Sequence, residues 1–355
     1  MFRSGLSNSL CNAHMLASFQ HMCLPRACAR LSTAASLSDA ENTLRRSYLY
    51  VPASSSRMLE KSLTTDSDVI IYDLEDSIPP SASDKDSARQ RLSDFLNNTL
   101  VTPQPDRIAV RVNDITTPFF QSDISQVLKL PSVRTLILPK IHAPEDLHYV
   151  SRVIRNSLVH ESSRDPSISP LNIVASIESA RSTYNLGNIA SWKSEYGPIT
   201  GGRLRSLLFA SEDYCADTSV IRTKSRQELL FVRSRIVITA KAFGLNAIDM
   251  VCINYKDLNY LKDECEDGRK LGFDGKQAIH PTQVQTIQST FVPTSQEILR
   301  AAKILQQMEA AHTSQRGAFG LETTDGGKEM IDAPMLKQAL KTIHAAKMAG
   351  LEIPI

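Results

Sequence analysis

The chain has 355 residues, which is long enough for one large domain with extensions, and 40 Lys and Arg nearly balance 38 Asp and Glu. No dense basic stripe is present, which argues against nucleic acid as the main partner. No apolar run approaches the roughly 20 residues that span a bilayer, so the sequence predicts no membrane partner. The six cysteines form no C-x-x-C pair, so their spacing indicates neither a zinc knuckle nor a disulfide framework.

The first part of the chain differs in composition from the rest. Residues 1–38 contain no Asp or Glu, although the chain-wide frequency predicts about four in a segment of this length. The segment carries Arg3, Arg26 and Arg30 and is rich in Ser and Ala. This composition is typical of a transit peptide and predicts a mature protein in the mitochondrial matrix. The alternative is a plain disordered tail.

Apolar runs alternate with helical patterns over residues 45–292. The predicted strands are 47–53, 68–76, 108–113, 133–140, 172–179, 206–213, 247–255 and 276–280, and the clearest helices are 56–64, 83–96, 144–158, 226–244 and 258–271. Eight such strands, each followed by a helix, predict an α/β protein built as a parallel (β/α)8 TIM barrel. The alternative is an open doubly wound sheet. No glycine-rich dinucleotide fingerprint follows the first strand, which argues against that alternative.

The residues after the barrel, 293–355, predict a C-terminal helical lid. A long helix over 295–311 begins after Thr294, which is a favourable N-cap residue. A polar, glycine-bearing stretch over 314–328 then suggests a hinge, and a last helix begins near Asp332.

Two apolar runs near the middle of the chain each end on a carboxylate, Glu178 and Asp213. At the carboxyl ends of barrel strands these side chains would face the place where barrel enzymes do their chemistry. One or two carboxylates, completed by water and substrate, are the usual protein contribution to a Mg²⁺ site. The alternative is that each carboxylate caps the helix that follows it.

Ten short stretches carry a resemblance to a known family, and they occur in that family's order. They are 46–52, 73–77, 111–113, 138–140, 177–179, 212–213, 242–244, 275–281, 317–319 and 331–332. The chain resembles the HpcH/HpaI aldolase and citrate lyase β-subunit superfamily, and within it the CoA-thioester lyases. The resemblance implies Mg²⁺-dependent cleavage of a carbon–carbon bond in a short 3-hydroxyacyl-CoA, with citramalyl-CoA first and malyl-CoA close behind. It also implies a 2-oxo acid product and a homo-oligomer, with a homotrimer favoured.

The resemblance implies roles for individual residues. Glu178 and Asp213 would hold Mg²⁺, and Arg111 would clamp the substrate carboxylate, which suits the two-point geometry of a guanidinium. The alternative for Arg111 is a structural ion pair with one of the acids Asp73, Glu75 and Asp76. Those three acids are expected to form a charged network that orients Arg111 and Lys140.

Three further residues are expected to meet the substrate's CoA portion. Arg46 would contact a CoA phosphate, while Ile279 and His280 would line the path of the acyl and pantetheine groups. Departures from the family pattern occur at Ala53, His142 and Ser211, and they affect no proposed ligand.

Asp332 is the expected acid or base of the reaction, because the resembling lyases supply an Asp from the C-terminal lid, often from a neighbouring subunit. Proton transfer needs a carboxyl group within hydrogen-bond reach of the reacting atom. The alternative is that Asp332 caps the last helix, since Pro334 follows closely.

Two other functions remain open from the sequence. One is a citrate lyase β subunit, which works with an acyl-carrier partner. The other is a non-catalytic barrel that binds CoA or another protein.

Overall fold

The computed structural model describes residues 44–98, 103–160, 170–313, 319–322 and 328–354. The segment 1–38, expected to be a transit peptide, lies outside the described residues. Among the residues that are described, no helix has the length and apolar character that a membrane crossing requires.

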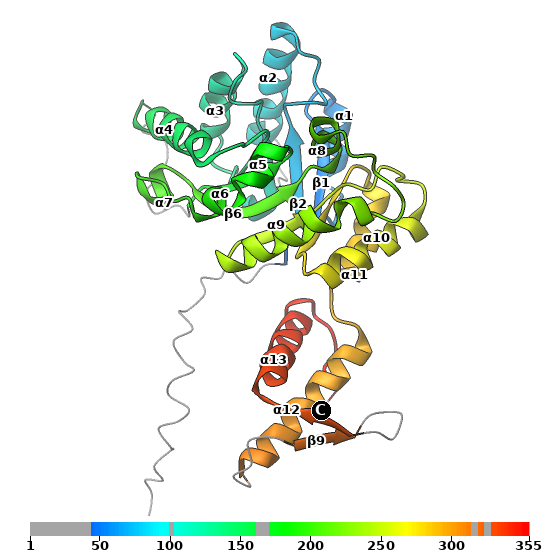
Figure 1. Ribbon diagram of the computed structural model, residues 1–355. Helices are drawn as coiled ribbons and strands as arrows, with labels where there is room; N and C mark the ends of the chain where they lie inside the picture. Colours follow the sequence, from blue (N-terminus) through cyan, green and yellow to red (C-terminus); the bar gives the residue numbers. More distant parts are fainter. Residues whose placement is uncertain (1–43, 99–102, 161–169, 314–318, 323–327, 355) are drawn as a thin grey trace, which may run out of the picture. The chain divides into compact units, whose positions relative to one another are not determined.

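Eight parallel strands form a closed barrel with helices around it (Figure 1). The ring closes where β1 pairs with β8, with Leu49 opposite Ala278. The predicted (β/α)8 barrel is therefore confirmed, and the open sheet is excluded because its first and last strands would not pair. The strands are β1 (Ser47–Pro52), β2 (Val69–Asp73), β3 (Ile108–Arg111), β4 (Thr135–Leu138), β5 (Asn172–Ile177), β6 (Arg203–Phe209), β7 (Asn246–Asp249) and β8 (Gly275–Ala278).

Alternation along the strands separates two apolar cores. In β2, Val69 and Ile71 belong to the cluster inside the barrel, whereas Ile70 and Tyr72 belong to the cluster between the strands and the helices. The helices that cover this outer face are α1 (Ser56–Ser62), α2 (Ala82–Asn98), α3 (Phe120–Leu128), α4 (Pro144–His160), α5 (Ala180–Tyr184), α6 (Leu186–Ser191), α7 (Gly197–Thr200), α8 (Ser211–Thr218), α9 (Leu230–Ala242), α10 (Leu258–Leu271) and α11 (Val284–Thr290). Short 3-10 turns are η3 (Pro105–Arg107), η4 (Gln227–Leu229) and η5 (Pro281–Gln283).

The sixth strand ends earlier than the sequence predicts. β6 ends at Phe209 and α8 begins at Ser211, so the prediction of a strand through Asp213 is wrong. Glu212 and Asp213 instead occupy the first turn of α8, where carboxylates interact favourably with the positive end of the helix dipole.

The residues after the barrel form a module with its own apolar cluster. It consists of α12 (Ser295–Thr313), an antiparallel pair of strands β9 (Phe319–Glu322) and β10 (Lys328–Ile331), and α13 (Ala333–Met348). Ile304 of α12, Ile331 of β10 and Ile343 of α13 meet in this cluster.

The start of α12 matches the sequence prediction. Thr294 Oγ1 accepts a hydrogen bond from the backbone N–H of Glu297 at 3.2 Å, and the Glu297 carboxylate accepts one from the N–H of Thr294 at 2.7 Å. The stretch 314–328, expected to be a hinge, contains β9 and the first residue of β10. Its segments 314–318 and 323–327 lie outside the described residues.

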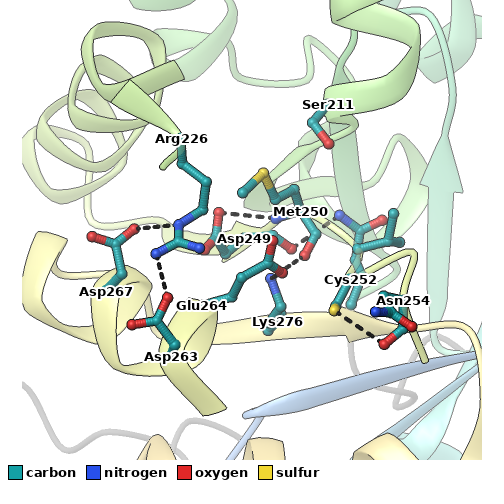
Figure 2. A network of polar contacts seen from close by, with 12 residues as sticks. Ser211, Arg226, Asp249, Met250, Cys252, Asn254, Asp263, Glu264, Asp267 and Lys276 are labelled. Atoms are coloured by element: carbon teal, nitrogen blue, oxygen red, sulfur yellow. Dashed lines mark hydrogen bonds and ion pairs between the residues drawn. The ribbon is translucent and has the colours of Figure 1, made fainter. Parts of the chain in front are cut away.

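A buried cluster of charges lies between the last strands and their helices (Figure 2). Lys276 of β8 and Glu264 of α10 are completely buried and form an ion pair of 3.1 Å. Lys276 also donates to the carbonyl of Met250 at 2.7 Å. Burial acts to raise the pKa of Glu264, but the charges of Lys276 and Arg222 lower it to about 2. Buried ions are tolerated when opposite charges and hydrogen bonds replace their water in this way.

This ion pair should make the protein sensitive to acid. The pKa of Glu264 is lower in the folded chain than its ordinary value of 4.5, so ionised Glu264 stabilises the fold fully above that value. The contribution, about 3 kcal/mol in total, is lost as the pH falls towards 2. We expect the difference in unfolding free energy between wild type and Glu264→Gln to shrink by this amount across that range. Denaturant titrations measure it, and a difference that does not depend on pH would contradict the assignment.

Candidate active site

The carboxyl ends of the barrel strands surround a cavity of about 400 Å³. Arg111, Glu178 and Asp213 line it together with Asp73 and Asp76. Parallel strands of a closed barrel all end at the same rim, which is why residues so far apart in the sequence meet here.

Glu178 lies one residue beyond β5 and is only 5% exposed. It does not cap the following helix, because Ser179 does so: its Oγ accepts a hydrogen bond from the N–H of Ser182 at 3.0 Å. Burial raises the pKa of Glu178 to about 7, and the negative charges of Asp213 and Glu75 act in the same direction.

Asp213 is exposed and lies in the first turn of α8. It is not the N-cap residue of that helix, because Ala210 occupies the N-cap position. Two carboxylates that face one cavity repel each other, and a divalent cation between them removes this repulsion. The described residues contain no group of three or more His, Cys, Asp or Glu side chains placed for a metal. A cation here would therefore take its other ligands from water and substrate, which is how Mg²⁺ binds. The oxygen donors of Glu178 and Asp213 fit that ion.

Arg111 is held by acids from the end of β2. Its Nε and Nη2 donate to the two carboxylate oxygens of Asp73 at 2.7 and 2.8 Å. Its Nη1 lies 3.1 Å from Glu75 and 3.0 Å from Asp76. The structural alternative for Arg111 is thus present in the molecule. The Asp76 side chain is 60% exposed, so its contact is the one that a substrate carboxylate could replace most easily.

Lys140 extends this network on the other side of Glu75. Its ammonium group donates to Glu75 at 2.6 Å. The backbone of Lys140 has a φ of 52°, in the left-handed region that costs a non-glycine residue about 1 kcal/mol or more. Such strain persists only where neighbouring contacts hold the residue in place, as Glu75 does here.

A second cavity, of about 850 Å³, adjoins the first. Tyr50, Pro52 and Ile279 line both cavities, so they share a wall. His280 lines only the larger one, where its ring stacks on Tyr255 with 4.8 Å between the ring centroids. Two of the residues expected along the acyl and pantetheine path, Ile279 and His280, therefore lie together beside the acidic cavity.

Two other residues from the sequence analysis lie elsewhere. Arg46 directly precedes β1, at the opposite end of that strand from the cavity rim, and binds both oxygens of Asp68 at 2.8 and 2.9 Å. This geometry gives no support to a contact between Arg46 and a CoA phosphate. Asp332 caps α13, with Oδ1 accepting from the N–H of Met335 at 3.3 Å, and it lines neither cavity.

The sequence analysis missed Arg222, Glu264 and Lys276. Lys276 falls within the family-like stretch 275–281, which was the one available signal for this group. Arg222 lies in the loop after α8, where neither periodicity nor a motif marks it. Only the fold brings Arg222 into contact with Ser211 and Glu212 at the cavity rim.

Comparisons with known proteins show the family to which the chain belongs. A family model described as HpcH/HpaI aldolase/citrate lyase matches residues 46–281, and another, described as a C–C bond lyase of the TIM-barrel fold, matches residues 234–350. The chain is 31% identical to the mitochondrial citramalyl-CoA lyase of Rattus norvegicus over 315 residues, which cover 88% of each protein. It is 29% identical to the citrate lyase subunit beta of Leuconostoc mesenteroides subsp. cremoris over 303 residues, covering 85% of this chain and 93% of that protein.

A solved structure of similar fold supports the same family. The protein CitE from Mycobacterium tuberculosis, in complex with magnesium, acetoacetate and coenzyme A, is 25% identical with a TM-score of 0.65. The match covers 87% of this chain and 99% of that one. Because one family model spans nearly the whole barrel and the identity reaches 31% over most of the chain, this protein belongs to the HpcH/HpaI aldolase/citrate lyase family.

Proposed function

We propose that this chain is a Mg²⁺-dependent carbon–carbon lyase that cleaves (S)-citramalyl-CoA into acetyl-CoA and pyruvate. The observation that carries the proposal is the meeting of Glu178, Asp213 and Arg111 around one cavity, beside a larger cavity that could take a thioester arm. The identity of 31% and 30% to the rat and human mitochondrial citramalyl-CoA lyases supports the choice of substrate.

The chain's own residues would bind and orient the substrate. Glu178 and Asp213 would hold Mg²⁺ through their carboxylate oxygens. When bound, Mg²⁺ would stabilise negative charge on the oxygen of the carbon that becomes the keto group. Arg111 would exchange its contact with Asp76 for the substrate carboxylate, while Asp73 keeps the guanidinium plane fixed.

The bond changes balance without any further reactant. A base removes the hydroxyl proton, and the bond between the hydroxyl-bearing carbon and the methylene of the thioester breaks. The electron pair of that bond goes to the methylene carbon as the acetyl-CoA enolate. We assign the proton that completes acetyl-CoA to Asp332, whose carboxyl would have to reach this carbon.

Malyl-CoA is the substrate most similar to citramalyl-CoA, because it lacks only one methyl group. A methyl group supplies about 1–3 kcal/mol of discrimination, so we expect some cleavage of malyl-CoA to acetyl-CoA and glyoxylate.

A citrate lyase β subunit is the second candidate function, favoured by the 29% identity to such a subunit. That reading requires an acyl-carrier partner, so cleavage of free CoA thioesters by the purified chain would exclude it. A non-catalytic barrel is disfavoured because Arg111, Glu178, Asp213 and Asp332 are all present.

A coupled assay on citramalyl-CoA and malyl-CoA, with and without Mg²⁺, tests the proposal directly. We expect Glu178→Gln and Asp213→Asn each to abolish Mg²⁺-dependent turnover, because each removes an anionic ligand and keeps the side-chain shape. Glu60→Gln, an exposed acid on α1 that lines neither cavity, is the matched control and should retain wild-type activity. Wild-type Mg²⁺ dependence in a folded Glu178 or Asp213 variant would refute the metal assignment.

The role of Asp332 can be tested by mixing subunits. Asp332→Asn should lower turnover by orders of magnitude and leave Mg²⁺ binding unchanged, since it removes only the proton carrier. We propose a homotrimer in which the C-terminal module serves a neighbouring subunit. Re-assembled mixtures of Asp332→Asn and Glu178→Gln chains should then regain activity at interfaces that combine two intact halves. Mixtures that stay inactive would mean that Asp332 serves its own chain, and full activity of Asp332→Asn alone would leave it only the helix cap.

We also propose that the protein acts in the mitochondrial matrix. The absence of acids from residues 1–38 and the mitochondrial names of the rat and human relatives support this. A fluorescent reporter fused behind residues 1–40 should enter mitochondria. The same fusion with Arg3, Arg26 and Arg30 changed to Glu should stay outside them. A wild-type fusion that stays in the cytosol would contradict the targeting role.

A further inference from the structure

The first turn of α8 forms part of the wall of the acidic cavity. Ser211, Glu212 and Asp213 form its first turn, and all three line the acidic cavity. The N-cap residue, Ala210, has no side chain that could cap the helix, although its N–H donates to the carbonyl of Ile177 at 3.1 Å. Something else must hold this turn if Asp213 is to face Glu178 in a fixed position.

Arg222 contacts this turn from behind the cavity. Its Nη1 donates to Ser211 Oγ at 3.1 Å and forms an ion pair with Glu212. Its Nη2 donates to the carbonyl of Val251, another residue of the cavity wall, at 3.0 Å. The Arg222 side chain is only 9% exposed and does not line the cavity, so it acts on the site through these neighbours.

The other contact of Arg222 is an anchor in the buried charge cluster. Nη2 lies 2.8 Å from Oε1 of Glu264, whose other oxygen pairs with Lys276 at 3.1 Å. Figure 2 shows Glu264 and Lys276 together, with Met250 beside them. Because Glu264 and Lys276 are completely buried, they fix the guanidinium from a part of the barrel that cannot easily move.

We propose that Arg222 is a positioning residue: held by the buried pair of Glu264 and Lys276, it fixes the first turn of α8 and so directs the Asp213 carboxylate towards Glu178. This inference rests on the proposed metal site.

A positioning role and a purely electrostatic role for Arg222 predict opposite changes in Mg²⁺ affinity when the residue is replaced. Arg222 is a positive charge near the cavity, and removing it would by charge alone strengthen the binding of a cation. Loss of positioning would weaken that binding, because residues that orient metal ligands change metal affinity by about 10- to 100-fold when they are removed. The sign of the change therefore separates the two roles.

The test is calorimetric titration of the metal-free protein with Mg²⁺. We expect Arg222→Met to raise the Kd for Mg²⁺ by about tenfold or more, with a circular dichroism spectrum like that of the wild type. The fold should persist because Lys276 still pairs with Glu264. Arg222→Lys keeps the charge and loses the two-pronged geometry, so it should also raise the Kd. It serves as the deciding variant if Arg222→Met does not fold. An unchanged or lower Kd in a folded variant would overturn the inference.

Arg226→Met is the matched control. Arg226 lies in the same loop, and its buried guanidinium pairs with Asp263 and Asp267 of α10, away from the cavity lining (Figure 2). This variant should lower the melting temperature and leave the Kd for Mg²⁺ within about twofold of wild type. If Arg226→Met weakens Mg²⁺ binding as much as Arg222→Met does, the effect is general destabilisation and the inference fails. Wild-type protein that binds no Mg²⁺ would overturn the metal site and this inference together, whereas normal binding by all variants would overturn this inference alone.

Discussion

The concentration of negative charge at one end of the barrel is the constraint on which the site depends. Asp73, Glu75, Asp76, Glu178 and Asp213 all lie at or beside the carboxyl ends of the strands. Carboxylates brought this close repel one another unless positive charge accompanies them or one of them takes up a proton. Arg111 and Lys140 supply that charge for the acids that follow β2. Glu178 and Asp213, in contrast, form no ion pair with a Lys or Arg among the described residues, and a divalent cation suits this pair.

The two arginines near the cavity, Arg111 and Arg222, differ in their contacts and therefore in the roles they suit. Arg111 lines the cavity and has one contact, to the exposed Asp76, that a substrate could exchange. Arg222 lies outside the cavity, and its acceptors are a buried carboxylate, a carbonyl oxygen, a hydroxyl and Glu212. An exchangeable contact suits substrate binding, whereas a guanidinium whose acceptors all belong to the protein suits the holding of structure.

Features that depend on contacts between neighbours in the chain could be predicted from the sequence, whereas contacts between residues far apart in the chain could not. The barrel was predictable because each strand and helix carries its own local pattern, and Thr294 was predictable because a cap involves only neighbours in the chain. The end of β6 was misread because the apolar run through Phe209 gives no sign of where a helix begins. The contacts of Arg46 and Arg222 could not be predicted from the sequence, which suggested a CoA phosphate for Arg46 and no role for Arg222. Only the fold pairs the first with Asp68 at the far end of β1 and brings the second behind Asp213.

Capping and catalysis are compatible roles for Asp332. The cap uses one oxygen, Oδ1, and the side chain of an N-cap residue stands at the solvent-facing end of its helix. The C-terminal module has its own apolar cluster around Ile304 and Ile343, which would preserve this geometry if the module closes as proposed. A cap also limits the rotamers of Asp332, which means that closure of the module would bring an already oriented carboxyl group to the substrate. If Asp332 transfers the proton as proposed, the helix cap would orient its carboxyl group for that step, and the two roles would not be alternatives.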